Sequence, residues 1–331
     1  MMHPALLIVG AILVIFASCE LFVNSIEWLG RKLHVSENAV GTVLAAIGTA
    51  LPESMVTLIA LVFSHGGAVE QSIGIGAIIG GPLMLGTIAY FSVGLTTLLW
   101  RKKRTLGTRL ELDQIGVSRD VLWFMAIFVV AIGFSLVSSY PIKVLVALGL
   151  IGAYFVYVFG QLGKEAGEQR GLHPLHFHRR VSIPDTWRVI VQVALGIAGM
   201  IYGAHLFVEN LSEVAEGVGL SAVVLSILLS PVATELPEIM NAVLWVRQGK
   251  EDLAVGNVAG SMLVQSAIPC ALGLAFSPWK LSFEPLAGVA AILISVLFVF
   301  ASLRASRLSA RRLLSTAVPY VALVAVLVIW R

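Results

Sequence analysis

GTALPESM at residues 48–55 returns as VATELPEIM at residues 232–240, each inside a long apolar part of the chain. Both copies contain Leu-Pro-Glu, so Glu53 and Glu238 occupy corresponding places. An unpartnered charge at the centre of a membrane costs about 2.5–3.5 kcal/mol on insertion scales, so a bound cation or proton is expected to compensate each carboxylate. Paired, proline-broken acidic segments in a hydrophobic chain are typical of the ion site of a transporter.

The composition is that of a polytopic membrane protein. Of the 331 residues, 58% are hydrophobic and only 12% are charged, which excludes a soluble protein with one buried core. The first apolar segment has neither the basic n-region nor the cleavage site of a signal peptide, so we interpret it as a retained helix. We predict an all-α fold of ten transmembrane helices, at residues 4–29, 38–63, 71–99, 120–138, 141–162, 188–213, 219–246, 252–276, 282–303 and 313–330.

Basic residues fall on one side of this predicted topology. With the first loop in the cytoplasm, all of the 22 lysines and arginines lie inside except Lys143, Lys280 and Arg331. The positive-inside rule therefore predicts a multi-pass protein of the cell (cytoplasmic) membrane with both termini on the extracytoplasmic side. The same rule explains the RKKR cluster at residues 101–104 as a topological signal, and no nucleic-acid partner is expected.

The two halves are related beyond the acidic segments. Leu-Phe-Val at residues 21–23 recurs at 206–208, at the same offset of 185 residues that relates Glu53 to Glu238. This spacing indicates an internal duplication. Each copy holds five predicted spans, an odd number, so the second copy enters the membrane with the opposite orientation. We predict two inverted-topology five-helix repeats, at residues 1–163 and 188–331, joined by a cytoplasmic linker at 164–187.

Pro52 and Pro237 are predicted to break their helices. Proline has no backbone N–H and clashes with the preceding turn, so carbonyl groups near Thr49 and Thr234 become free. Carbonyls, threonine hydroxyls and carboxylates are hard oxygen ligands. They suit Ca²⁺ or Na⁺, whereas a zinc or copper site would require His or Cys.

The duplicated motif, the ten predicted helices and the glycine-rich helices after each motif resemble the cation/calcium exchanger superfamily, sodium/calcium exchanger branch, over essentially the whole chain. That family carries a GTSxPE-like segment in each repeat and a GNxxGSNxxN/D-like segment one helix later. The resemblance implies that Glu53 and Glu238 are the central carboxylates that coordinate Ca²⁺. It also implies that Thr49 and Thr234 supply oxygens to the ions.

The chain departs from the family pattern at several ligand positions. The serine after the motif threonine is Ala50 in the first copy and Glu235 in the second. In the third predicted helix, the polar positions of the family are occupied by Ala77, Gly81, Pro82 and Leu85. The eighth predicted helix keeps Asn257 and Ser261 but has Gln265 where the family has Asn or Asp. The resemblance therefore implies a lopsided site, with most of its ligands in the second repeat.

Further ionisable residues lie in the predicted spans. Glu235 and Glu238 share a helix face, and they should not both ionise without a cation near them, which favours a divalent ion or proton exchange. The alternative is that Glu235 only faces the cavity around the site. Glu20 and His205 each precede the repeated Leu-Phe-Val. They are candidates for a proton relay or for a pair across the repeats, while a place in a water-filled vestibule is the favoured alternative.

The sequence thus predicts a secondary active antiporter that exports Ca²⁺ in exchange for Na⁺ or H⁺. The absence of the family's polar residues from the third predicted helix favours H⁺ over Na⁺ as the counter-ion. The alternatives are another cation, Mg²⁺, Mn²⁺ or K⁺, and a non-transporting scaffold. An enzyme is not expected, because the chain has no HExxH motif and no evident serine–histidine pair. The expected partners are inorganic cations and the lipid bilayer, with no cofactor; the oligomeric state is left open.

Overall fold

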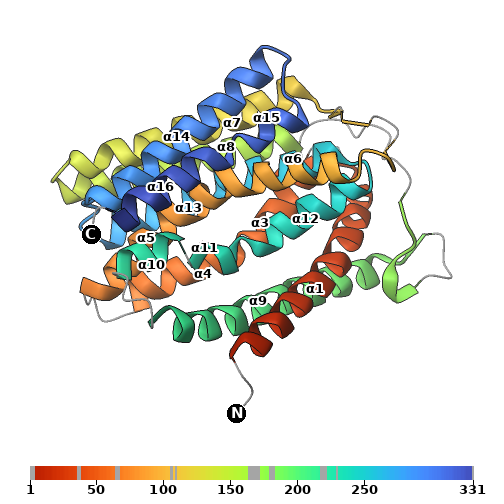
Figure 1. Ribbon diagram of the computed structural model, residues 1–331, viewed down its shortest axis with the longest axis horizontal. Coiled ribbons are helices and arrows are strands. Elements are labelled where there is room, and N and C mark those ends of the chain that lie inside the picture. Colours follow the sequence, from red (N-terminus) through yellow and green to blue (C-terminus); the bar gives the residue numbers. More distant parts are fainter. Residues whose placement is uncertain are drawn as a thin grey trace.

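The computed structural model describes residues 4–35, 39–63, 68–104, 107–108, 110–162, 172–178, 183–216, 222–228 and 230–329. Over these residues the chain is helical and contains no β-strand (Figure 1). In chain order the elements are α1 (Pro4–Lys32), η1 (Val40–Ala45), α3 (Ala46–Thr49), α4 (Leu51–Leu58), η2 (Ile59–Phe63), α5 (Ala68–Met84), η3 (Leu85–Ala89), α6 (Tyr90–Leu99), α7 (Gln114–Gly133), η4 (Phe134–Leu136), α8 (Tyr140–Leu162), η5 (His176–His178), α9 (Thr186–Glu216), α10 (Ala222–Leu228), α11 (Ser230–Thr234), α12 (Leu236–Arg247), α13 (Glu251–Phe276), α14 (Phe283–Arg304), α15 (Ala310–Leu314) and α16 (Ala317–Ile329).

Eight helical stretches of the described chain are long and apolar enough to cross a membrane. They are Val9–Lys32, Gln71–Leu99, Gln114–Leu136, Tyr140–Leu162, Thr186–Gly203, Glu251–Phe276, Phe283–Arg304 and Ala310–Leu327. The predicted spans at 38–63 and 219–246 do not belong to this set, because both are divided into shorter elements. The all-helical, multi-pass class is confirmed, and the ten-helix inverted repeat stays a prediction.

The two acidic motifs lie where their helices are divided. One division falls at Ala50, between α3 and α4, and the other at Glu235, between α11 and α12. Both residues have ψ close to zero, with φ, ψ values of −77°, 0° and −93°, −3°. Pro52 and Pro237 take the second position of the new helix, where a missing N–H is tolerated because the first turn has no intrahelical acceptor. The carbonyls four residues earlier lose their helical donor for the same reason.

Helix α13 lies at the centre of the molecule. It is buried along most of its length and contacts α5, α7, α8, α12 and η1. Figure 1 shows α7, α8, α14 and α16 on one side of it, and α1 packed along α9 on the opposite side. The divided helices lie between these two groups. Both motif breaks are thereby enclosed by helices, where bare backbone groups are tolerated at membrane depth.

Two glycines allow the divided helices to approach closely. A Cβ added at Gly260 of α13 would lie 2.2 Å from the backbone oxygen of Thr42 in η1. A Cβ added at Gly80 of α5 would lie 2.3 Å from Pro231 and 2.8 Å from the backbone oxygen of Ile227. Gly80 follows the first acidic motif and packs against the divided helix of the second half of the chain. Gly260 follows the second acidic motif and packs against the divided helix of the first half. Small residues at such crossings let two backbones pack tightly.

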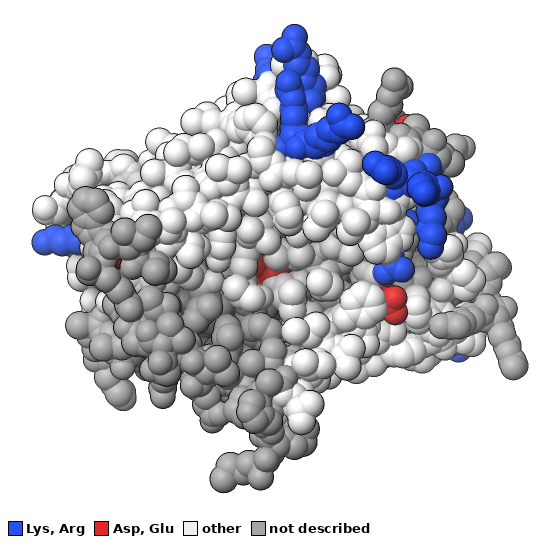
Figure 2. All heavy atoms as spheres, in the orientation of Figure 1, with Lys and Arg blue, Asp and Glu red and all other residues white. Residues whose placement is uncertain are grey.

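Buried ion pairs connect the helices near one end. Lys250 pairs with Glu27 of α1, and Arg104 pairs with Glu251 of α13. The indole Nε1 of Trp245 also donates to Glu27, at 2.8 Å. Figure 2 shows that the Lys and Arg side chains visible on this face gather mainly at the end where α6, α12 and α14 finish.

We expect Gly80→Ala and Gly260→Ala to destabilise the protein, because in each case the new methyl group meets backbone that has no free space to move into. Overpacking of this kind costs about 1–3 kcal/mol. Thermal unfolding of the full-length protein in detergent measures the effect. Gly152→Ala in α8 is the control, since nothing lies within 4 Å of its Cβ position. An unchanged melting temperature for Gly260→Ala would contradict the packing described above.

Candidate cation site

Glu53 and Glu238 are the centre of the candidate site. Each lies in the first turn of a helix that begins after a motif break, Glu53 in α4 and Glu238 in α12. The partial positive charge of a helix N-terminus favours a carboxylate there. Both side chains are buried, with 1% and 0% of their surface exposed. Within the described chain, none of their four carboxylate oxygens makes a hydrogen bond of normal geometry. Buried carboxylate oxygens without such hydrogen bonds are suited to receive a positive ligand.

The motif threonines connect the two halves of the site. The Thr234 side chain lies beside the Glu53 carboxyl, and the Thr49 side chain lies beside that of Glu238. Each glutamate is therefore next to the threonine of the other motif. Thr49 Oγ1 donates to the backbone oxygen of Ala45 at 3.1 Å and lies 3.4 Å from Ser261 Oγ of α13. The hydroxyl oxygens keep lone pairs that can face a cation.

Glu235 has a different environment from the other two glutamates. Its Oε1 and Oε2 both accept from Nε2 of Gln265, each at 2.9 Å, and Thr234 Oγ1 lies 3.4 Å from Oε1. Glu235 and Gln265 are both buried. The structure therefore brings these two predicted site residues together as a hydrogen-bonded pair.

The helices that carry the candidate site also hold three buried polar side chains without hydrogen bonds in the described chain. Asn257, a predicted site residue on α13, has no hydrogen-bond partner for its amide atoms among the described residues. The same holds for the amide of Asn241 and the hydroxyl of Thr57. Neither Asn241 nor Thr57 is singled out by the sequence motif. Their spacing was the available signal, because residues three or four positions after a helical glutamate share its face.

The donor set decides which ligand fits. Within the described residues, no three His, Cys, Asp or Glu side chains converge as in a preformed metal centre. A cation would therefore be held by one or two carboxylates together with neutral hydroxyl, amide and carbonyl oxygens. Mixed sets of this kind are typical of hard cations such as Ca²⁺.

Helix α1 covers the second motif break. Cys19 Sγ lies 3.8 Å from the backbone oxygen of Pro237, and its electrostatic neighbour is Glu238. Because α1 packs along α9, these two helices together form one wall over the site.

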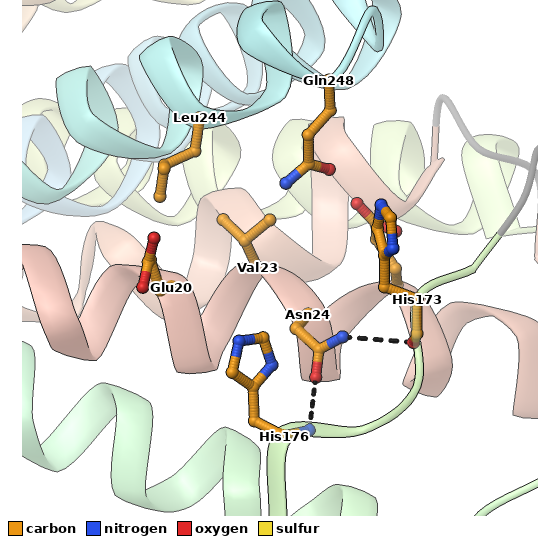
Figure 3. Close-up of a pocket in the computed structure, with 8 residues that line it drawn as sticks. Glu20, Val23, Asn24, His173, His176, Leu244 and Gln248 are labelled. Carbon is orange, nitrogen blue, oxygen red and sulfur yellow. Dashed lines mark hydrogen bonds between the residues drawn. The ribbon is translucent and has the colours of Figure 1, made fainter. Parts of the chain in front are cut away.

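A separate pocket lies between α1, α12 and residues 172–178 (Figure 3). Its volume is about 120 Å³, and its lining consists of Glu20, Val23, Asn24, Glu27, His173, His176, Leu244 and Gln248. The Asn24 side chain makes two hydrogen bonds to residues 172–178. Its Nδ2 donates to the backbone oxygen of His173 at 3.3 Å, and its Oδ1 accepts from the backbone N–H of His176 at 3.0 Å. The structure places Glu20 in this pocket and His205 on α9 with an exposed side chain.

Comparison with known proteins agrees with this fold. The model of the sodium/calcium exchanger protein family matches residues 3–163 and 188–329. The sodium/calcium exchanger MaX1 of Methanosarcina acetivorans is 26% identical over 307 residues, with 82% of this chain and 83% of that protein covered. The inner membrane protein YrbG of Escherichia coli (strain K12) is 26% identical over 294 residues, with 87% and 83% covered.

The fold resembles that of a solved exchanger. The sodium-calcium exchanger NCX_Mj, soaked with Na⁺ and Sr²⁺, superposes with a TM-score of 0.73 at 18% identity and covers 97% of both chains. The family match spans nearly the whole chain, and the buried glutamates lie at the breaks of both motif helices. This chain belongs to the sodium/calcium exchanger protein family.

Proposed function

We propose that this cation/calcium antiporter exports Ca²⁺, with Glu53 and Glu238 as the central ligands and Thr49, Thr234, Ser261 and Asn257 as sources of neutral oxygens. One observation carries the proposal: four carboxylate oxygens at two helix N-termini are buried and make no hydrogen bond of normal geometry in the described chain, and the hydroxyls that lie beside them, those of Thr234 and Thr49, are neutral. A divalent cation between the two carboxylates balances both charges, and the partial positive charge of each helix N-terminus stabilises the ionised carboxylate that holds the cation.

Protons are our first choice for the counter-ion, and Na⁺ is the second. A Na⁺ ion needs several neutral oxygens, but α5 has Ala77 and Gly81, and the adjoining η3 has Leu85, at the positions where the family pattern has polar side chains; all three residues are buried. Protons require only the carboxylates themselves. The relative MaX1 is named a sodium/calcium exchanger, which supports Na⁺.

The distribution of charge supports the orientation. Lys and Arg gather at one end of the face in Figure 2, and the positive-inside rule assigns this end to the cytoplasm. Under this proposal both termini are extracytoplasmic. The pocket of Figure 3, which adjoins the buried Glu27–Lys250 pair, then belongs to the cytoplasmic half.

Calcium flux in proteoliposomes tests the activity. We expect Ca²⁺ movement under an imposed pH gradient or Na⁺ gradient, and loss of more than about 100-fold in Glu53→Gln and Glu238→Gln, because even residues that only orient a metal ligand cost 10–100-fold. Glu284→Gln is the matched control, since it makes the same change at the surface start of α14. Folded protein with no flux under either gradient would exclude calcium exchange and leave Mg²⁺, Mn²⁺, K⁺ or a scaffold role.

Stability in detergent tests the two ligands independently of transport. In cation-free, mildly alkaline buffer, Glu53→Gln and Glu238→Gln should each raise the melting temperature, because each removes a buried charge that costs about 1–3 kcal/mol when no cation compensates it. Adding Ca²⁺ should stabilise the wild type and Glu284→Gln but neither site variant. A melting temperature of Glu238→Gln below that of the wild type in cation-free buffer would contradict this account.

A further inference from the structure

Three departures from the family pattern lie in contact with one another. They are Glu235, Gln265 and Gly81, which come from the second motif, α13 and α5. A Cβ added at Gly81 would lie 2.8 Å from Gln265 Oε1 and 3.1 Å from Glu235 Oε1. Because these residues are far apart in the sequence, only the fold reveals that the three changes form one cluster.

The carboxylates of the site fall into two kinds. Glu53 and Glu238 have no hydrogen-bond partner in the described chain, whereas both oxygens of Glu235 accept from the Gln265 amide at 2.9 Å. An amide N–H₂ group presents two partially positive hydrogens and lies where a cation would otherwise contact Glu235. A cation at that place would have to displace the amide.

The backbone of α5 closes the other side of the pair. At Gly81 no side chain separates α5 from Gln265 and Glu235, and the short distances from its Cβ position show that even a methyl group has little room there. Neither a serine ligand nor an ion next to it fits without movement of the pair. The cluster is thus filled by the chain's own groups.

We infer that Gln265 and Gly81 replace one bound cation at Glu235, so that the transported ion is left with the position at Glu53 and Glu238. This inference rests on the proposed function and deepens it: Gln265 becomes the residue that sets how many cations the cavity holds. The amide stabilises Glu235 in every step of the cycle, whereas a cation there would have to be bound and released.

The test is a gain of cation dependence. Gln265→Met keeps a similar side-chain volume and removes both hydrogens, which leaves Glu235 buried without its amide donor. The full-length protein in detergent is melted in choline chloride, NaCl or choline chloride with CaCl₂, at equal ionic strength. We expect Gln265→Met to melt several degrees below the wild type in choline chloride and to regain this loss with Na⁺ or Ca²⁺.

Two variants make the result specific. Ser266→Ala changes a buried neighbour on α13 whose hydroxyl donates to the Leu263 oxygen of its own helix at 2.8 Å, and it should respond to cations as the wild type does. Glu235→Gln combined with Gln265→Met removes the charge as well. It should lose the additional cation response that Gln265→Met gains.

The opposite results overturn the inference. One such result is that Gln265→Met loses the same amount of stability in all three salts. The other is that Glu235→Gln abolishes the stabilisation by cations as completely as Glu238→Gln does. Failure of the proposed function has a different signature: Glu53→Gln and Glu238→Gln would then respond to cations as the wild type does. That result would not alter the comparison of Gln265→Met with the wild type.

Discussion

A helix cannot continue unchanged through Leu-Pro-Glu, and the rest of the structure depends on this constraint. Proline removes one backbone donor, so the helix divides and a new N-terminus forms inside the membrane. Glu53 and Glu238 follow directly in the first turn, where the helix dipole favours their charge. The same break leaves carbonyl groups without helical donors. An apolar environment tolerates neither feature alone, so the surrounding helices must enclose both and a ligand must compensate them.

Close packing meets the first of these needs. Gly260 lets α13 touch the divided helix of the first half, and Gly80 lets α5 touch that of the second half. Hydroxyl groups satisfy irregular backbone elsewhere: Ser295 Oγ donates to the Gly86 oxygen at 2.6 Å, and Thr316 Oγ1 donates to the Thr87 oxygen at 2.8 Å, both in the π-helical turn η3. This turn follows Pro82 within the same span. At Glu53 and Glu238 no hydrogen bond of this kind compensates the carboxylate in the described chain, and under the proposed function a cation does so.

The sequence predicted the class of the protein, and it supplied the two glutamates at the centre of the proposed site. Hydropathy identified the spans that are continuous helices, because about twenty apolar residues in a row satisfy their own backbone bonds. It predicted the segments at 38–63 and 219–246 as single spans, since hydropathy does not register a break inside an apolar run. The prolines in the repeated motif indicated where those breaks fall. Residue type alone also predicted oxygen ligands for a hard cation.

Long-range contacts decided the rest. The sequence placed Glu235 and Gln265 in the site as candidate ligands, but only the tertiary structure pairs them with each other and closes α5 at Gly81 upon them. It also sets Thr234 beside Glu53 and Thr49 beside Glu238, and it turns Asn241 and Thr57 into buried polar groups of the same region. The sequence by itself determined a helical membrane exchanger with two proline-broken acidic motifs, because apolar length and proline chemistry are local. The tertiary structure alone decided which carboxylates stay without donors, because a hydrogen-bond partner from a distant helix is set by packing and not by spacing along the chain.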